Sequence, residues 1–191
     1  IGSIIQFISE NGYYPKFLDA GCGNGHTLAC IKEAFPEMEV YGFEYNQKLL
    51  KLAQSRNLSG TEIFFHDIRE TFPQDDFDMI LTERVIVNLH SRNQQLRAFK
   101  NIHSALKEQG EYILIESFQQ SLDELNAMIQ ENAQELVVPS KHNFYLKLGT
   151  WHNMKKLGFE LMPGPFPENQ LSTYFVLTRV FHPMIRGKDE K

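Results

Sequence analysis

Three glycines at alternate positions are the most informative group of residues in this chain. Gly21, Gly23 and Gly25 follow a short apolar stretch that ends in Asp19, and a helical pattern begins directly after them. Glycine permits sharp backbone turns and leaves no Cβ between the backbone and a ligand. The N-terminus of the following helix presents free N–H groups and the positive end of its dipole. Such a combination typically cradles a polar or anionic small molecule, most often a nucleotide-like cofactor.

The spacing of the loop separates two kinds of cofactor site. Dinucleotide-binding oxidoreductases use G-x-G-x-x-G, and the third glycine of that pattern would fall on His26 here. The carboxylate of Asp19, directly before the loop, would repel a pyrophosphate. The same carboxylate suits a ligand that carries an ammonium and a sulfonium group. An NAD(P)-binding oxidoreductase is therefore kept only as the less favoured alternative.

A predicted alternation of strands and helices positions this loop. We expect strands over residues 16–20, 39–43, 61–65, 76–82 and 111–116, and helices over 1–9, 25–35, 47–55 and 91–106, the last with Ser91 as its N-cap. The strands have few polar interruptions, as buried parallel strands do. With right-handed crossovers, this order gives a doubly wound α/β sheet.

The last third of the chain has a different pattern. Helices are expected over 121–136 and 151–157, an irregular segment over 137–149, and strands over 159–162 and 171–180. The final strands would lie at one edge of the sheet, so residues 1–191 are expected to form a single domain. Because the chain begins with Ile1 instead of Met, we also expect that some N-terminal sequence is missing.

The segment DAGCGNG resembles motif I of the class I S-adenosylmethionine-dependent methyltransferases, in which an acid precedes G-x-G-x-G. The later segments DFDMILTERVIVNL and LKEQGEYILIES resemble the strand-four and strand-five motifs of that family, so the resemblance covers residues 15–117. It implies a seven-stranded, mostly parallel Rossmann-like sheet with an antiparallel strand near the C-terminus. It also implies S-adenosylmethionine as cofactor and S-adenosylhomocysteine as product.

The resemblance assigns roles to individual acids. Glu44 stands where the family holds both ribose hydroxyls, and one carboxylate can accept two hydrogen bonds from a cis-diol. Asp67 stands at an adenine contact, and Asp19 at the methionine part of the cofactor. As alternatives, Glu44 could be a solvated strand-end acid and Asp67 a capping acid. The expected cofactor-binding residues are Asp19, Gly21, Cys22, Gly23, Gly25, Glu44, Tyr45, Asp67, Ile68 and Thr82.

The residues after the fourth strand bear on the methyl acceptor. Thr82-Glu83-Arg84-Val85 stands where members that methylate adenine or glutamine carry [D/N/S]-P-P-[Y/F/W], which disfavours those acceptors. We expect Arg84, with Asn88 nearby, to bind a carboxylate or phosphate of the acceptor. A structural salt bridge at Arg84 is the alternative. The segment from Glu83 onward also resembles bacterial methyltransferases associated with nucleotide-sugar or polysaccharide genes, which implies a sugar or sugar-nucleotide acceptor.

His142, in the irregular segment after the fifth strand, is the candidate general base, because imidazole gains and loses a proton near neutral pH. His90 is a second candidate on similar grounds, and a loop histidine without a role is the alternative for both. Methyl transfer requires alignment of acceptor, methyl and sulfur but no protein nucleophile. A cofactor-binding domain without catalytic activity is therefore also left open.

Composition narrows the partners and the compartment. The formal net charge is −5 and the basic residues are dispersed, which disfavours nucleic-acid binding. No signal peptide and no apolar run of transmembrane length are evident, so no membrane partner is expected. Cys22 and Cys30 are expected to be free thiols of a cytoplasmic protein, and no His/Cys cluster has metal-ligand spacing. The oligomeric state is not indicated.

Overall fold

The computed structural model describes residues 1–11, 14–132 and 135–162. It divides the chain into two compact units, Ile1–Glu116 (unit 1) and Ser117–Lys191 (unit 2). The expected strand over 171–180 lies outside the described residues. The expectation of one domain over the whole chain therefore stays a prediction.

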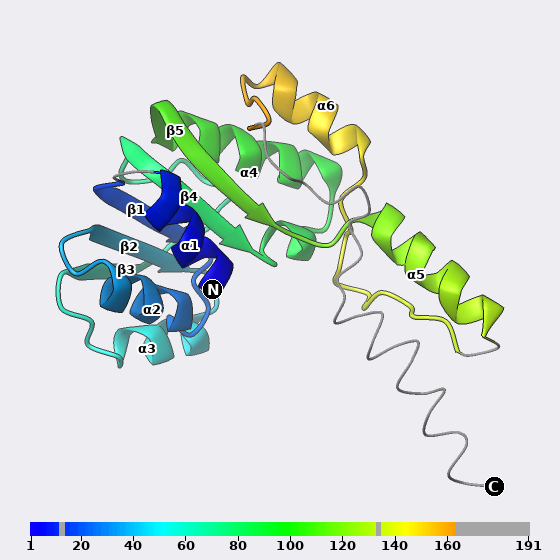
Figure 1. Cartoon of the computed structure of the whole chain (residues 1–191), viewed down its shortest axis with the longest axis horizontal. Helices are drawn as coiled ribbons and strands as arrows, with labels where there is room; N and C mark the ends of the chain where they lie inside the picture. Colours follow the sequence, from blue (N-terminus) through cyan, green and yellow to red (C-terminus); the bar gives the residue numbers. More distant parts are fainter. Residues whose placement is uncertain (12–13, 133–134, 163–191) are drawn as a thin grey trace, which may run out of the picture. The chain divides into compact units, whose positions relative to one another are not determined.

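Unit 1 is built on a five-stranded sheet in the order β3-β2-β1-β4-β5 (Figure 1). Every strand pairs in parallel with its neighbour, which confirms the expected α/β class with a parallel sheet. The seven strands and the antiparallel C-terminal strand of the expectation are not seen among the described residues and stay predictions. Its strands are β1 (Lys16–Ala20), β2 (Glu39–Glu44), β3 (Thr61–Phe65), β4 (Phe77–Glu83) and β5 (Leu106–Ile115).

Helices cover both faces of the sheet, as a doubly wound fold requires. Three of them share one hydrophobic core with alternate residues of the strands: α1 (Gly2–Asn11), α2 (His26–Ala34) and α3 (Gln47–Gln54). The fourth, α4 (Arg92–Ala105), has the ring of Phe99 6.3 Å from that of Tyr112 in β5, whereas Ile113 packs against the core of the first three. Successive strand residues point to opposite faces, so α4 covers the other side. None of the helices among the described residues is long and apolar enough to span a bilayer.

Two helices of unit 1 begin at residues whose side chains cap them. The side chain of Asn46 accepts hydrogen bonds from the N–H groups of Lys48 and Leu49 and so begins α3. Ser91 accepts one from Gln94 N–H at 3.3 Å and begins α4, which confirms the expected cap. The fifth strand begins at Leu106, earlier than the expected residue 111, and its register with β4 shifts between Leu106 and Glu111.

Unit 2 contains α5 (Gln119–Glu131) and α6 (Gly149–Lys156). The expected helix over 121–136 ends early, because the Asn126 side chain bonds both the N–H and the C=O of Val137 and gives the backbone another partner. The irregular segment expected over 137–149 is confirmed up to Leu148, and α6 begins at Gly149. The expected strand over 159–162 is wrong: Phe159 N–H bonds back to Met154 C=O at 3.2 Å and closes the end of α6.

Candidate functional site

The pocket of interest lies in unit 1, where the strand order reverses between β1 and β4. The chain leaves β1 towards β2 and β3, and later returns to add β4 and β5 on the other side. A crevice opens at the carboxyl ends of strands at such a point, because the loops diverge there. Asp19 is paired with Leu81 across these strands, so both strand ends reach the same edge.

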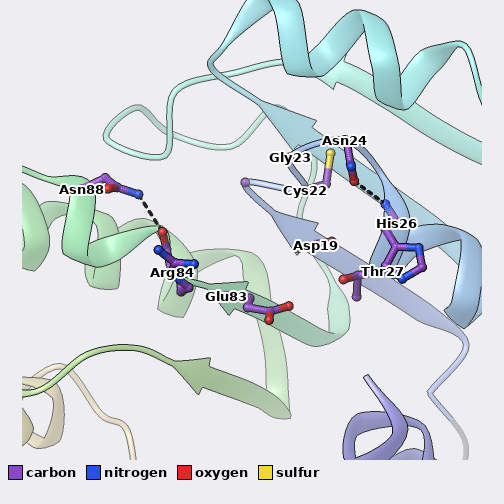
Figure 2. A pocket seen from close by; sticks show the side chains of 10 residues that line it. Asp19, Cys22, Gly23, Asn24, His26, Thr27, Glu83, Arg84 and Asn88 are labelled. Atoms are coloured by element: carbon purple, nitrogen blue, oxygen red, sulfur yellow. Dashed lines mark hydrogen bonds between the residues drawn. The ribbon is translucent and has the colours of Figure 1, made fainter. Parts of the chain in front are cut away.

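A pocket of about 370 Å³ occupies this edge. Figure 2 shows the glycine loop and the start of α2 on one side of it, and the end of β4 with the turn that follows on the other. The lining residues are Asp19, Gly21, Cys22, Gly23, Asn24, His26, Thr27, Glu83, Arg84 and Asn88.

The glycine loop folds back over the end of β2. The N–H groups of Gly21 and Cys22 both donate to Phe43 C=O at 2.9 Å. Gly21 has φ 93°, and a Cβ there would come within 2.5 Å of a Val85 methyl, so a side chain would be both strained and crowded. By contrast, a Cβ at Gly23 would meet nothing within 4 Å. The loop is therefore closely packed at Gly21 and open to a ligand at Gly23.

Glu44 ties this loop to the end of β2. Its Oε2 accepts the N–H of Gly23 at 2.9 Å, and its Oε1 accepts the N–H of Asn46 at 2.7 Å. From the far end of α3, Arg56 Nε donates to Asn24 C=O at 2.6 Å. Each carboxylate oxygen has two lone pairs, so Glu44 keeps capacity to accept hydrogen bonds from a ligand.

Asp19 is the electrostatic centre of the pocket. It is only 3% exposed, and burial raises its pKa to about 8, with further contributions from the negative charges of Glu83 and Glu44. A negative charge brought beside Asp19 would be repelled, whereas a cation there would stabilise the ionised carboxylate. Burial, with Asp19 and Glu44, also raises the pKa of the Cys22 thiol, so Cys22 does not supply a thiolate near neutral pH.

Asp67, which is expected at the adenine, and Tyr45 lie outside the pocket lining. The Asp67 carboxylate accepts hydrogen bonds from Arg69, at 2.9 Å from Nε to Oδ1, and these bonds hold its pKa below the usual range. The Arg69 guanidinium also lies 5.7 Å from the ring centroid of Tyr45, which is 59% exposed and stands 5.7 Å from the ring of Phe65. Tyr45 is thus an exposed aromatic surface beside an acid that already has a cationic partner.

Two further expected residues are enclosed. Ile68 is buried, and its C=O accepts a hydrogen bond from Asn101 at 3.0 Å. Thr82 is fully buried, with its hydroxyl 2.7 Å from that of Tyr112 on the face of the sheet that α4 covers. Thr82 is therefore enclosed as a whole and is not part of the pocket lining. Gly25, at the start of α2, also stays outside the lining, although its N–H closes the loop on Cys22 C=O.

Arg84, the expected acceptor contact, does line the pocket. It adopts φ 57°, a left-handed conformation that is rare for a residue with a side chain. Its N–H donates to Ile115 C=O at 2.8 Å, and its own C=O accepts from the Asn88 side chain at 2.7 Å, a bond visible in Figure 2. The structure thus brings the two acceptor-side candidates together on one turn.

His142, the expected general base, belongs to unit 2. It is exposed in a turn closed by a 2.8 Å hydrogen bond from Asn143 N–H to Ser140 C=O. His90 is exposed as well, just before α4. Catalytic roles for both histidines stay predictions.

Sequence reasoning did not assign four residues that line the pocket, Asn24, His26, Thr27 and Glu83. Asn24 lies within the glycine loop itself. His26 and Thr27 are the first residues of α2, and Glu83 is the last residue of β4. Their places directly after the glycine loop and at a strand end were the available signal, because both places adjoin the carboxyl edge of the sheet.

The chain is similar to a known protein family and to a named methyltransferase. A family described as "Methyltransferase domain" matches residues 15–162. A protein of Encephalitozoon cuniculi named as a methyltransferase is 31% identical over 110 residues, which cover 54% of this chain and 47% of that protein. The chain therefore spans about half the length of this curated relative.

Two solved structures share the fold at lower identity. The YcgJ protein of Bacillus subtilis is 19% identical with a TM-score of 0.60, over 81% of this chain and 65% of that one. CalS10 of Micromonospora echinaspora, described as an amino pentose methyltransferase with bound S-adenosylmethionine, is 24% identical with a TM-score of 0.56, over 62% of this chain and 50% of that one.

Proposed function

Because the chain belongs to the methyltransferase domain family, we propose that it transfers a methyl group from S-adenosylmethionine to an oxygen or nitrogen of a small acceptor. The observation that carries this proposal is the buried carboxylate of Asp19, with Glu83 and Glu44 close enough to raise its pKa. Asp19 and Glu83 of the pocket lining, with Glu44 close to Asp19, favour a positively charged group beside Asp19. S-adenosylmethionine carries an ammonium and a sulfonium, whereas the pyrophosphate of NAD(P) would add negative charge.

The residues present fit this cofactor on two further grounds. Gly23 leaves open space in which a ligand can approach the backbone, and Glu44 beside it can accept hydrogen bonds from a cis-diol. Asp19 would hold the methionine part and Glu44 the ribose. Tyr45, exposed on the same strand end as Glu44, offers an aromatic face for the base, with Asp67 and Ile68 nearby in sequence.

When bound, the cofactor supplies an electrophilic methyl group on sulfur. The work left to this chain is to align an acceptor atom with that methyl group and to take up a proton from the acceptor where it has one. Arg84 and Asn88 stand on the wall of the pocket opposite the glycine loop and would orient the acceptor. His142 is proposed as the group that takes up the proton.

We propose that the acceptor is a sugar or sugar nucleotide. A guanidinium such as that of Arg84 suits a phosphate or carboxylate on the acceptor, and the description of CalS10 as an amino pentose methyltransferase points to the same class. The thiols of Cys22 and Cys30 are free, which supports the cytoplasmic location proposed for the chain.

Calorimetry with the full chain tests the cofactor. We expect S-adenosylhomocysteine to bind and NAD not to bind, and binding of NAD alone would overturn the proposal. Transfer is then tested with S-adenosylmethionine labelled in its methyl group and a panel of sugar nucleotides, free amino sugars and RNA. Label in a sugar nucleotide or amino sugar supports the proposed acceptor class, and label in RNA contradicts it. Binding without transfer to any of them would favour a non-catalytic cofactor-binding domain.

A further inference from the structure

Glu116 is a partly buried acid that the proposed reaction does not use. It directly follows β5, and its carboxylate accepts hydrogen bonds from three successive main-chain N–H groups. Oε1 accepts from Val85 at 2.7 Å and from Ile86 at 2.6 Å, and Oε2 accepts from Val87 at 3.2 Å. We propose that Glu116 is a positioning residue, which holds the turn after β4 so that Arg84 presents its guanidinium to an anionic group of the acceptor.

The first step of the argument is the shape of the turn. A 3₁₀ helix over Ile86–Asn88 follows Arg84 almost at once. Arg84 itself has φ 57°. This left-handed conformation is disfavoured by about 1 kcal/mol for a residue with a Cβ. Such a conformation persists only where surrounding contacts determine it. Something outside the turn must therefore hold it.

The contacts that hold it come from the end of β5. Ile115 C=O accepts the N–H of Arg84 at 2.8 Å, and Glu116 accepts the next three N–H groups. Four successive N–H groups are thus fixed by two adjacent residues. Of these acceptors only the Glu116 carboxylate is a side chain, so only it can be changed by substitution without altering the main chain.

The second step is what the turn carries. Arg84 and Asn88 both line the pocket. Val85, between them, packs so closely on the glycine loop that a Cβ at Gly21 would lie 2.5 Å from its methyl group. A shift of this turn would therefore move the acceptor-side wall of the pocket relative to the glycine loop.

The third step is the energetic cost of an acid at this place. Burial raises the pKa of Glu116 to about 7, although the three N–H groups and the charge of Arg84 act in the opposite direction. The titratable and charged groups that interact with it are Arg84 and Tyr112, whose hydroxyl is in turn bonded to Thr82 of β4. A neutral glutamine could keep both Oε1 bonds at a lower desolvation cost. The ionised carboxylate is the form that satisfies all three N–H groups.

The role rests on the proposed function, in which Arg84 faces the acceptor, but its test does not require methyl transfer or cofactor binding. Inorganic sulfate serves as the anionic probe, because its charge is constant between about pH 5.5 and 8.5. Nuclear magnetic resonance follows the Arg84 Nε–H and the amides of Val85, Ile86 and Val87 in the full chain. Four variants are compared: E116Q, E116A, R84A and the control E111Q, which removes another acid of β5 whose partner is Tyr14.

We expect sulfate to shift the Arg84 signal in the wild-type chain and in E111Q, and not to bind R84A at this place. E116A should bind sulfate at least about fivefold more weakly, and E116Q, which keeps both Oε1 bonds, within about twofold of wild type. The three amides should titrate together with a midpoint at about 7 in the wild type and not in E116Q. Wild-type sulfate affinity in E116A, or sulfate without effect on Arg84, would overturn the proposal.

If E116A does not fold, the amide titration and the comparison of wild type with E116Q still test whether Glu116 holds the turn. Amides that do not titrate in the wild type, or that titrate unchanged in E116Q, would show that Glu116 does not hold the turn. Failure of S-adenosylhomocysteine to bind would overturn the proposed function without touching any of these results.

Discussion

The carboxylate of Glu44 accepts the main-chain N–H of Gly23 at 2.9 Å, so the acid at the end of β2 is joined directly to the glycine loop that follows β1. The second oxygen of the same carboxylate accepts the N–H of Asn46 at the start of α3. One side chain therefore fixes the main chain on both sides of the proposed ribose site. The contribution of Glu44 to ligand binding can be separated from a general effect of negative charge by comparison with another acid of the same strand.

Glu44→Ala should weaken binding of S-adenosylhomocysteine by at least about 1 kcal/mol, or roughly fivefold, because hydrogen bonds to a charged group are lost and the loop loses its anchor. Calorimetry measures this change. Glu39→Ala is the matched control, because Glu39 is an exposed acid at the other end of β2. Equal affinity of Glu44→Ala and wild type would show that Glu44 does not contact the ribose.

Asp19→Asn should stabilise the ligand-free chain at pH 8 by on the order of 1 to 3 kcal/mol, because it removes a buried charge and keeps the shape of the side chain. In the wild type the folded state holds the Asp19 proton up to about pH 8, well above the ordinary value of 3.8. The free energy of unfolding should therefore fall as pH rises from about 4 to 8, and urea titrations measure this slope.

The same substitution should weaken binding of S-adenosylmethionine at least about tenfold, because the partner of its positive charge is lost. The variant would thus be more stable and less able to bind. Glu116 contributes to the pH slope in the same direction up to about 7, so Asp19→Asn should reduce the slope without abolishing it. An unchanged slope in Asp19→Asn would contradict the burial of an ionisable Asp19.

Gly21→Ala and Gly23→Ala should differ in kind. Both positions have positive φ, which disfavours alanine by about 1 to 2 kcal/mol, but only Gly21 also places its Cβ 2.5 Å from Val85. Gly21→Ala should therefore lower the free energy of unfolding more than Gly23→Ala, which should act chiefly on cofactor affinity. Urea denaturation and calorimetry on both variants check this, and the reverse order of stability would contradict the described loop.

Arg84→Gly should be more stable than Arg84→Ala by about 1 kcal/mol, because glycine adopts φ 57° without a clash of its Cβ. Both variants lack the guanidinium, so both should lose anion binding at the turn equally. Urea denaturation of the pair isolates the backbone effect. Equal stability would mean that residue 84 does not hold the left-handed conformation in solution.

The sequence allowed the central part of the fold to be predicted because its signals are local. Apolar runs ending in polar residues predicted all five strands of unit 1, and the spacing of Gly21, Gly23 and Gly25 predicted the loop. Asp19 could be placed in the pocket from its position at the end of β1. The role of Thr82 at the cofactor stays a prediction, while strand alternation turns its hydroxyl towards Tyr112.

The turn after β4 could not be predicted in the same way. The left-handed conformation of Arg84 depends on Ile115 and Glu116, which are far from it in sequence. No local pattern marks Glu116 as the acceptor for three N–H groups. The end of α5 in unit 2 was not predicted for a related reason. The side chain of Asn126 hydrogen-bonds the main chain of Val137, which is too far along the chain to be a helical partner.

The pairing of Asp19 with Leu81 also determines how ligands of this pocket can be found. One wall of the pocket is formed early in the chain and the other only when β4 has docked beside β1, so a compound that touches both walls binds the folded state alone. Such a compound should raise the melting temperature, with about 2.7 kcal/mol of added stability at a hundredfold excess over its Kd. A thermal-shift screen of sugar nucleotides, run in the presence of S-adenosylhomocysteine, would identify acceptor candidates without any assay of turnover.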